Sequence, residues 1–198
     1  MIGKLSKSNS HTDYVCQIHG PGEIASPPSP ADHAFGTFVR IPVSPHHGDL
    51  VGIIYDTVLL NPEFGNLGPR LSPLSDLAVF SPDYLAEKVT LVGITVVGML
   101  SPDSTPTQGV PPLAAQIDAP VARMDADDVR AFHQTPSGSV QVSYTPLLLA
   151  VGSPLARHLL LHVIQDLESL FPTQGATLAV LRNELAWQTT IGPLGGGV

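Results

Sequence analysis

A run of apolar and β-branched residues at positions 50–60 constrains the fold more than any other part of this chain. The run is too short to cross a membrane as a helix, and its composition is typical of a strand that is buried on both faces. We therefore expect it to lie in the middle of a sheet. The segment that follows, residues 61–72, contains two prolines and two glycines, which break regular structure. We predict a structured loop there, and ordered loops on rigid strands often carry function.

Several other segments have strand composition, and glycine recurs inside the apolar runs. Gly36, Gly52 and Gly93 each interrupt such a run. Because glycine inside a strand is typical of a tight bend, we predict a small, glycine-kinked β-barrel that is closed or half closed, not a flat sheet. The expected strands are 2–18 (one strand, or two short strands around a turn at 9–13), 34–43, 50–60, 89–100, an edge strand within 114–121, and 140–144, with a surface loop at 101–109.

The C-terminal part of the chain has helical patterns instead. Asp125 is placed to cap a short helix that runs to about His133, with two further aspartates at the positive end of its dipole. From Ser153, expected to act as a cap, apolar residues recur at helical spacing until Pro172 ends the run. These residues are Leu155, Leu159, Leu160, Val163, Ile164, Leu167, Leu170 and Phe171.

A second helix is expected at about 175–187, with Leu178, Leu181, Leu185 and Trp187 facing inward. The fold class predicted is therefore mainly β with C-terminal α: a barrel domain over 1–146, a helical hairpin over 153–188 and a flexible tail over 189–198.

Composition excludes several classes of function. The 198 residues are 43% hydrophobic and 13% charged, which argues against disorder and suggests that another subunit covers some apolar surface. The net charge of −8, without a Lys/Arg cluster, argues against direct nucleic-acid binding. The single cysteine, Cys16, excludes an internal disulfide framework and fits a reducing compartment. No signal-like or 18-residue apolar segment is found, so we expect a cytoplasmic protein without membrane contact.

The strongest candidate for a functional surface follows the central strand. Asp56 interrupts that strand, and if it is buried it needs a partner or a place at the barrel rim, for which we choose Arg70. Trp187 is more typical of a core position, but an exposed tryptophan on a terminal helix would suit a docking face. The candidate interaction surface comprises Asp56, Asn61, Glu63, Phe64, Asn66, Arg70 and Trp187.

Histidines next to aspartates offer a competing interpretation as a metal or acid/base site. Alternation would place His11 and Asp13 on one strand face, yet no third ligand is evident, and we favour a turn held by side chain to backbone hydrogen bonds. His46 and His47, near Asp49, are best explained as a solvated turn.

Two further groups also have simple structural explanations. Cys16, inside an apolar strand, is expected to behave as a small hydrophobic residue. Asp127 and Asp128 are explained by the helix dipole. We therefore expect no catalytic residue, no metal and no cofactor.

The order of these segments resembles the HAS-barrel domain, the small β-barrel at the N-terminus of HerA-type hexameric DNA-translocase ATPases. The resemblance covers about 2–133. It is carried by residues 2–5 (Ile-Gly-Lys-Leu), 36–39 (Gly-Thr-Phe-Val), 50–54 (Leu-Val-Gly-Ile-Ile) and 91–93 (Leu-Val-Gly), and by the prolines that lead towards 119–121 (Ala-Pro-Val). The chain departs from that family in lacking a Gly-x-x-x-x-Gly-Lys-Ser/Thr loop, so the ATPase half is absent.

The resemblance implies a role in docking and oligomer assembly, performed in trans with a separate ATPase or nuclease subunit. Our leading hypothesis is a non-enzymatic subunit that assembles with such a partner or with copies of itself and does not contact DNA. Two alternatives remain open: a metal-dependent hydrolase that uses His11, Asp13, His46 and His47 at one barrel rim, and a small-ligand-binding β-barrel, which would need a wider interior.

Overall fold

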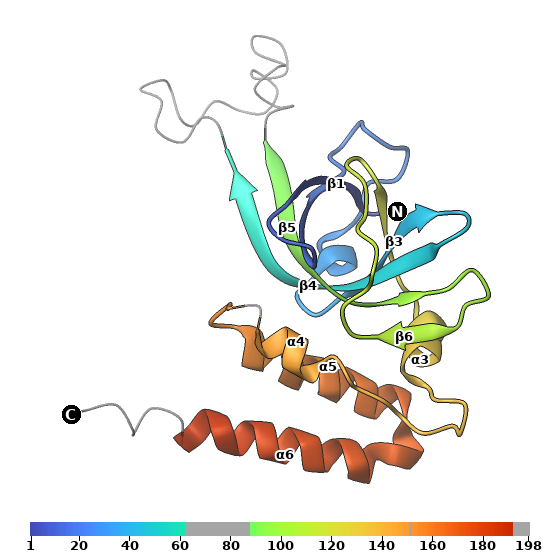
Figure 1. The fold of residues 1–198 in the computed structure, drawn as a ribbon. Helices are drawn as coiled ribbons and strands as arrows, with labels where there is room; N and C mark the ends of the chain where they lie inside the picture. The colour runs from blue at the N-terminus through green and yellow to red at the C-terminus, as the bar shows by residue number, and fades with distance from the viewer. Residues whose placement is uncertain (62–87, 151, 192–198) are drawn as a thin grey trace.

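The computed structural model describes residues 1–61, 88–150 and 152–191, with side chains through Ala186. Within these residues, six antiparallel strands close into a barrel, which confirms the predicted fold class (Figure 1). The sheet order is β2-β1-β7-β3-β4-β5-β6, and pairing of β2 with β5 closes the ring. The strands are β1 (Gly3–Ser8), β2 (Asp13–Ile18), β3 (Phe38–Ser44), β4 (Gly48–Leu60), β5 (Val89–Leu100), β6 (Pro106–Gln108) and β7 (Pro120–Arg123).

β5 closes the barrel because both of its edges are paired. One edge pairs with β4 over the whole length of β5, from Asp49↔Leu100 to Leu60↔Val89. The other edge pairs first with β2 and then, beyond the end of β2, with the short β6. Gly52 permits the tight approach of β4 to β5, since a Cβ atom there would run into Cγ2 of Ile94.

Two apolar cores lie on the two faces of the barrel wall. The first fills the barrel interior and includes Leu50 and Ile54 of β4. The second lies between the outside of the wall and the helices, and includes Val51 and Ile53 of the same strand. Residues 50–54 of β4 are therefore buried on both faces, as the apolar run predicts.

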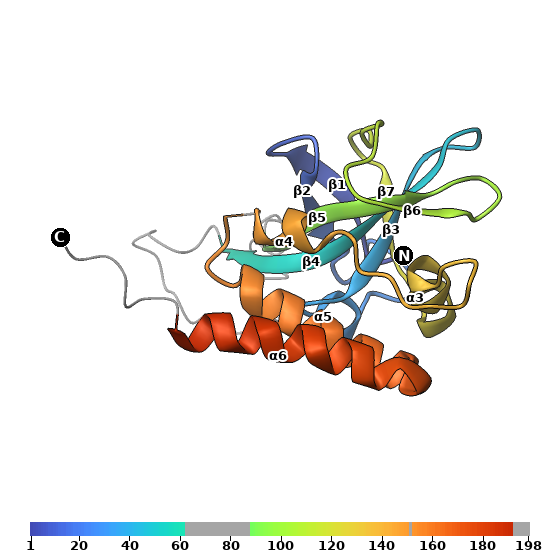
Figure 2. The same cartoon turned by 60° about the horizontal axis from the view of Figure 1, so that its bottom comes forward.

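The C-terminal helices α5 (Ala156–Leu170) and α6 (Gly175–Ile191) form a layer beneath the barrel (Figure 2). α5 lies next to the barrel, and α6 packs against α5 on the side away from the sheet. The N-cap predicted at Asp125 is confirmed, because its carboxylate accepts the backbone N–H groups of Asp127 and Asp128 at 3.0 and 2.9 Å. The helices are η1 (Pro30–His33), α3 (Ala126–His133), α4 (Thr145–Leu149), α5 (Ala156–Leu170), η2 (Pro172–Gln174) and α6 (Gly175–Ile191).

Three strand predictions need correction. The loop predicted at 101–109 contains β6, and the edge strand predicted within 114–121 becomes β7, an interior strand between β1 and β3. The strand predicted at 140–144 does not form beyond a single bridge from Val140 to Gln134. Side chains replace the ladder partners there: the Val140 N–H bonds to Oε1 of Gln174 at 2.5 Å, and the Ser143 N–H bonds to Oε1 of Gln108 at 2.7 Å.

Residues 2–18 form two strands, β1 and β2, which is the second of the two arrangements predicted for this segment.

The helical predictions are correct in position but not in every detail. Ser153 accepts the Leu155 N–H at 3.1 Å but lies ahead of the helix, which begins at Ala156. Leu155 and Leu181, expected inward, are 44% and 39% exposed. α6 continues to Ile191, which contradicts the predicted start of a flexible tail at 189. In the described part of the chain, no helix combines the length and hydrophobicity that crossing a membrane requires.

Candidate functional site

The most unusual surface of this molecule is the end of the β4–β5 ribbon, which extends past the barrel (Figure 1). Beside β4, the last pair with β3 is Phe38↔Ile53, followed by the backbone bond from the Ile54 N–H to the Thr37 carbonyl at 3.0 Å. Beyond that point β4 pairs with β5 alone. We call Asp56–Leu60 of β4, together with Val89–Leu91 of β5, the open ribbon.

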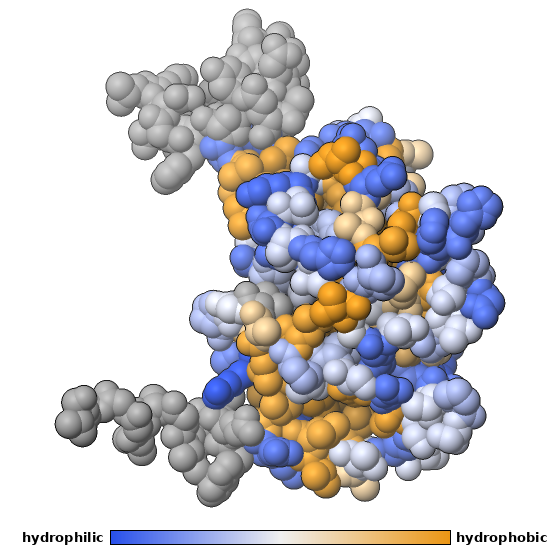
Figure 3. Space-filling model, viewed as in Figure 1, coloured by the Kyte–Doolittle hydropathy of each residue, from blue (hydrophilic) through white to orange (hydrophobic). Residues whose placement is uncertain are grey.

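Three consecutive apolar side chains of the open ribbon are exposed. Val58 is 46% exposed, Leu59 75% and Leu60 48%. Figure 3 shows hydrophobic surface at this end of the ribbon, at the upper left of the view. Natural proteins usually protect an exposed strand edge with charged residues, proline or a covering element, because an open edge can pair with another chain. Residues 57–60 contain neither a charge nor a proline, so this edge is suited to association with another polypeptide.

Asp56 lies at the start of the open ribbon and does not need the buried partner that we predicted. The residue is exposed, and its Oδ1 accepts the backbone N–H of Thr57 at 2.9 Å. A register shift between Ile54 and Asp56 turns the strand at this point, which explains how the side chain reaches solvent. The proposed partner Arg70 lies outside the described residues.

The other residues of the predicted interaction surface can be placed only in part. Asn61 is exposed and directly follows the open ribbon. Glu63, Phe64, Asn66 and the remainder of the 61–72 loop lie outside the described residues, as does the side chain of Trp187. The structure therefore brings Asp56 and Asn61 to one end of the barrel.

Two of the three histidines of the metal-site alternative, His11 and His47, have other partners in the structure. His11 Nε2 lies 2.8 Å from the Pro111 carbonyl oxygen, and His47 Nδ1 lies 2.7 Å from the Ser44 hydroxyl. Asp13 accepts hydrogen bonds from Tyr55 at 2.9 Å and from Asn9 at 3.1 Å. Among the described residues, no group of three or more His, Cys, Asp or Glu side chains is arranged to hold a metal ion.

A cavity of about 560 Å³ lies beside the open ribbon. Thr57 and Leu59 line one side of it, and the proline-rich connector after β2 lines the other. On that connector, Glu23 Oε2 accepts the Gly20 N–H at 3.1 Å and lies 3.2 Å from His19 Nδ1. These hydrogen bonds lower the pKa of the Glu23 carboxyl. The ordered connector gives the ribbon a firm wall on this face.

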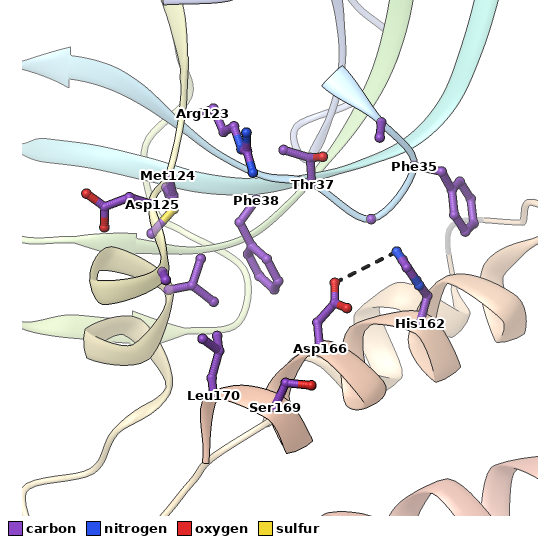
Figure 4. A pocket seen from close by; sticks show the side chains of 14 residues that line it. Phe35, Thr37, Phe38, Arg123, Met124, Asp125, His162, Asp166, Ser169 and Leu170 are labelled. Atoms are coloured by element: carbon purple, nitrogen blue, oxygen red, sulfur yellow. Dashed lines mark ion pairs between the residues drawn. The ribbon is translucent and has the colours of Figure 1, made fainter. Parts of the chain in front are cut away.

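A second cavity, of about 350 Å³, lies between the barrel and α5 (Figure 4). Phe35, Phe38 and Leu170 contribute apolar walls, and His162 and Asp166 point into it from α5 with 3.8 Å between Nε2 and Oδ2. This cleft lies outside the barrel, whose interior is filled by the first core. The wide interior that the ligand-binding alternative requires is therefore not formed by the described residues.

Comparison with protein families assigns the chain to one of them. Residues 1–194 match the model of the family described as Domain of unknown function (DUF8166). The chain belongs to the DUF8166 family. No curated protein matches it.

Sequence reasoning missed the exposed apolar residues of this DUF8166 domain. Val58, Leu59 and Leu60 were included in a strand that was expected to be buried on both faces, and the structure contradicts that expectation for residues 56–60. One signal was available: the polar pair Asp56 and Thr57 interrupts the apolar run. A polar break inside an apolar strand indicates the place where the strand leaves the core.

Proposed function

We propose that this DUF8166 domain is a non-enzymatic assembly and docking subunit, similar to a HAS barrel, that acts in trans with a separate HerA-type hexameric ATPase in cytoplasmic DNA processing or translocation. The observation that carries the proposal is the open ribbon, because a solvent-exposed strand edge with three consecutive exposed apolar residues is suited to protein association. Closed antiparallel barrel topology is compatible with the HAS-barrel resemblance.

Electrostatics support a role in which a partner, not this domain, contacts DNA. The domain carries 17 acidic and 9 basic residues, for a net charge of −8. A DNA backbone would be repelled by this charge, and counterion release, the main source of DNA affinity, needs clustered Lys and Arg. An acidic surface is no obstacle to a protein partner, which can present complementary charge.

The direct test is light scattering of the purified domain with and without the HerA-type ATPase encoded nearest to it in the genome. We expect a complex heavier than either component. Leu59→Lys should abolish the complex, because it places a charge on the open ribbon. Ile117→Lys is the matched control, since Ile117 is also exposed, at 65%, but lies in the loop before β7.

Two results would count against this proposal. One is a domain that never changes the mass of the ATPase at micromolar concentrations. The other is a complex that Leu59→Lys and Ile117→Lys weaken equally, because the open ribbon would then have no special part in association.

A further inference from the structure

We propose that the open ribbon pairs with the open ribbon of a second copy of this chain, through antiparallel β4–β4 pairing about a two-fold axis at Val58. The inference rests on the proposed function only in taking the ribbon as an association surface. It specifies the partner of the β4 edge, a second DUF8166 chain that extends the β4–β5 ribbon into a four-stranded sheet, and the ATPase of the proposed function then binds the exposed face of that paired ribbon.

The backbone of β4 has donors and acceptors directed to the open edge. Ile54 is bonded on this edge by the two residues just before β3: its N–H donates to the Thr37 carbonyl, and its carbonyl accepts the Gly36 N–H. The register shift before Asp56 reverses the alternation, so Thr57 is the next residue to direct its backbone groups outward. The Thr57 N–H bonds to the side chain of Asp56, which shows that no strand in the described chain occupies this donor. Leu59, two residues further on, faces the same edge.

These orientations select one register. Hydrogen-bonded pairs in an antiparallel ladder form between residues that both face the shared edge. Pairing Thr57 with Leu59 of the second copy meets this condition, and symmetry then places Val58 opposite Val58. With the axis at Thr57, Leu60 of one copy would lie opposite Ile54 of the other, where Gly36 and Thr37 already occupy the edge. With the axis at Leu59, Asp56 of one copy would have no strand residue opposite it, because β4 of the second copy ends at Leu60.

Charge and side-chain packing are compatible with this register. The two Asp56 carboxylates fall at opposite ends of the interface, four residues apart along the strand, or about 13 Å, which exceeds the screening length of about 8 Å at physiological salt. The central pairs are uncharged: Val58 with Val58 on one face, and Thr57 with Leu59 on the other. Cross-strand pairs of this type stabilise sheets, and each copy covers apolar surface that is exposed in the single chain.

Cysteine crosslinking can test both the interface and its register. The chain has one native cysteine, Cys16, which is 0% exposed and leaves a clean background. Residues in a non-hydrogen-bonded antiparallel pair have Cα atoms about 4.5 Å apart, inside the disulfide range of about 4.4–6.8 Å. Under oxidised glutathione, Val58→Cys should therefore form a covalent dimer on a non-reducing gel. Leu60→Cys should do so at least about tenfold more slowly, since its copies lie about 13 Å apart.

A mixture of two variants checks the register independently. Asp56→Cys on a chain with a larger tag, mixed with Leu60→Cys on an untagged chain, should give the mixed dimer as the main product, because these positions are opposite each other. Equal crosslinking of Val58→Cys and Leu60→Cys would overturn the proposal. So would sedimentation of the unmodified chain as a monomer at all concentrations up to about 100 μM, because self-pairing must increase with concentration by mass action.

The outcome separates this inference from the proposed function. A chain that fails to crosslink through Val58→Cys, yet binds the ATPase through a Leu59-dependent surface, refutes the self-pairing and leaves the docking role. A chain that crosslinks as expected but never engages the ATPase supports the self-pairing and refutes the docking role. Circular dichroism of each variant should match the wild-type spectrum, because the substituted side chains are all exposed.

Discussion

The hydroxyl of Tyr144 lies 2.7 Å from Nε2 of His133, and both side chains are buried between the barrel and the helices. The other ring nitrogen, Nδ1, lies 2.7 Å from the Val129 carbonyl oxygen, which can only accept a hydrogen bond. Nδ1 therefore carries the proton, and Nε2 accepts from Tyr144. This pair joins the end of α3 to the start of α4, and Phe38 and Phe132 pack edge-on against the imidazole.

Removing the Tyr144 hydroxyl should destabilise the protein. Tyr144→Phe leaves a buried imidazole nitrogen without a partner, and we expect the free energy of unfolding to fall by about 1–3 kcal/mol. Urea denaturation followed by circular dichroism measures this loss. Tyr55→Phe is the matched control: its hydroxyl bonds to Asp13 in a half-buried position, so water can replace the hydroxyl at lower cost. If both variants lost the same free energy of unfolding, the burial of the Tyr144 hydroxyl would not be the reason for the loss.

The buried histidine should also make stability depend on pH. Burial lowers the pKa of His133 from 6.5 to about 4. Between these values the unfolded chain binds a proton that the folded chain does not, so the free energy of unfolding falls as the pH is lowered from about 6.5 to about 4.

The double variant His133→Leu/Tyr144→Phe removes both polar partners and isolates this contribution. Its stability should change less between pH 7 and pH 4.5 than that of the wild type, by up to about 1.4 kcal/mol per pH unit. Urea titrations at both pH values measure the difference. Parallel pH profiles would show that His133 is not the responsible group.

Gly36 should tolerate no side chain, for two separable reasons. Its φ of 86° is unfavourable for residues with a Cβ atom, and that atom would collide with the ring of His162. We expect Gly36→Ala to lower the free energy of unfolding by about 2–4 kcal/mol. Gly138→Ala isolates the backbone cost, because Gly138 has a φ of 82° with the nearest heavy atom 3.9 Å from the added Cβ. Adding His162→Ala to Gly36→Ala should recover the difference between the two variants in thermal denaturation.

Cys16 should react with thiol reagents only after unfolding. Its side chain is 0% exposed, and burial raises its pKa to about 12, so the reactive thiolate is scarce. At pH 8, we expect the native protein to release no coloured thiolate from a disulfide reagent such as DTNB on a timescale of minutes. In 6 M guanidinium chloride, one equivalent per chain should react. Rapid reaction of the native protein would indicate that β2 opens frequently.

Much of the barrel can be predicted from the sequence because its signals are local. Apolar runs of strand length with glycine at the bends indicate curved strands, and Asp125 followed by two aspartates indicates a helix start through capping and the dipole. Both features involve neighbours within a few residues and were confirmed. The candidate site was predicted less well: Asp56 and Asn61 lie at the two ends of its exposed apolar residues, but those residues themselves were taken for core.

The remaining differences arise from contacts between distant segments. Val140 has strand composition, yet the side chain of Gln174, far along the sequence, takes its N–H and no ladder forms. β7 lies inside the sheet because β1 and β3 happen to present free edges on both sides of it. Neither the acceptor nor the edges can be recognised in the local pattern, since hydrogen-bond partners in a sheet are set by topology.

The sequence by itself determined that residues 50–60 would be a strand, because β-branched and apolar side chains favour extended backbone. The polar pair Asp56 and Thr57 divides that strand in the sequence, but tertiary structure decided which half would be buried. Val51 and Leu59 belong to the same apolar run, but β3 covers the edge beside Val51 and ends before reaching Leu59. Burial is a property of what packs alongside, so similar apolar side chains are core in one half of the strand and exposed in the other.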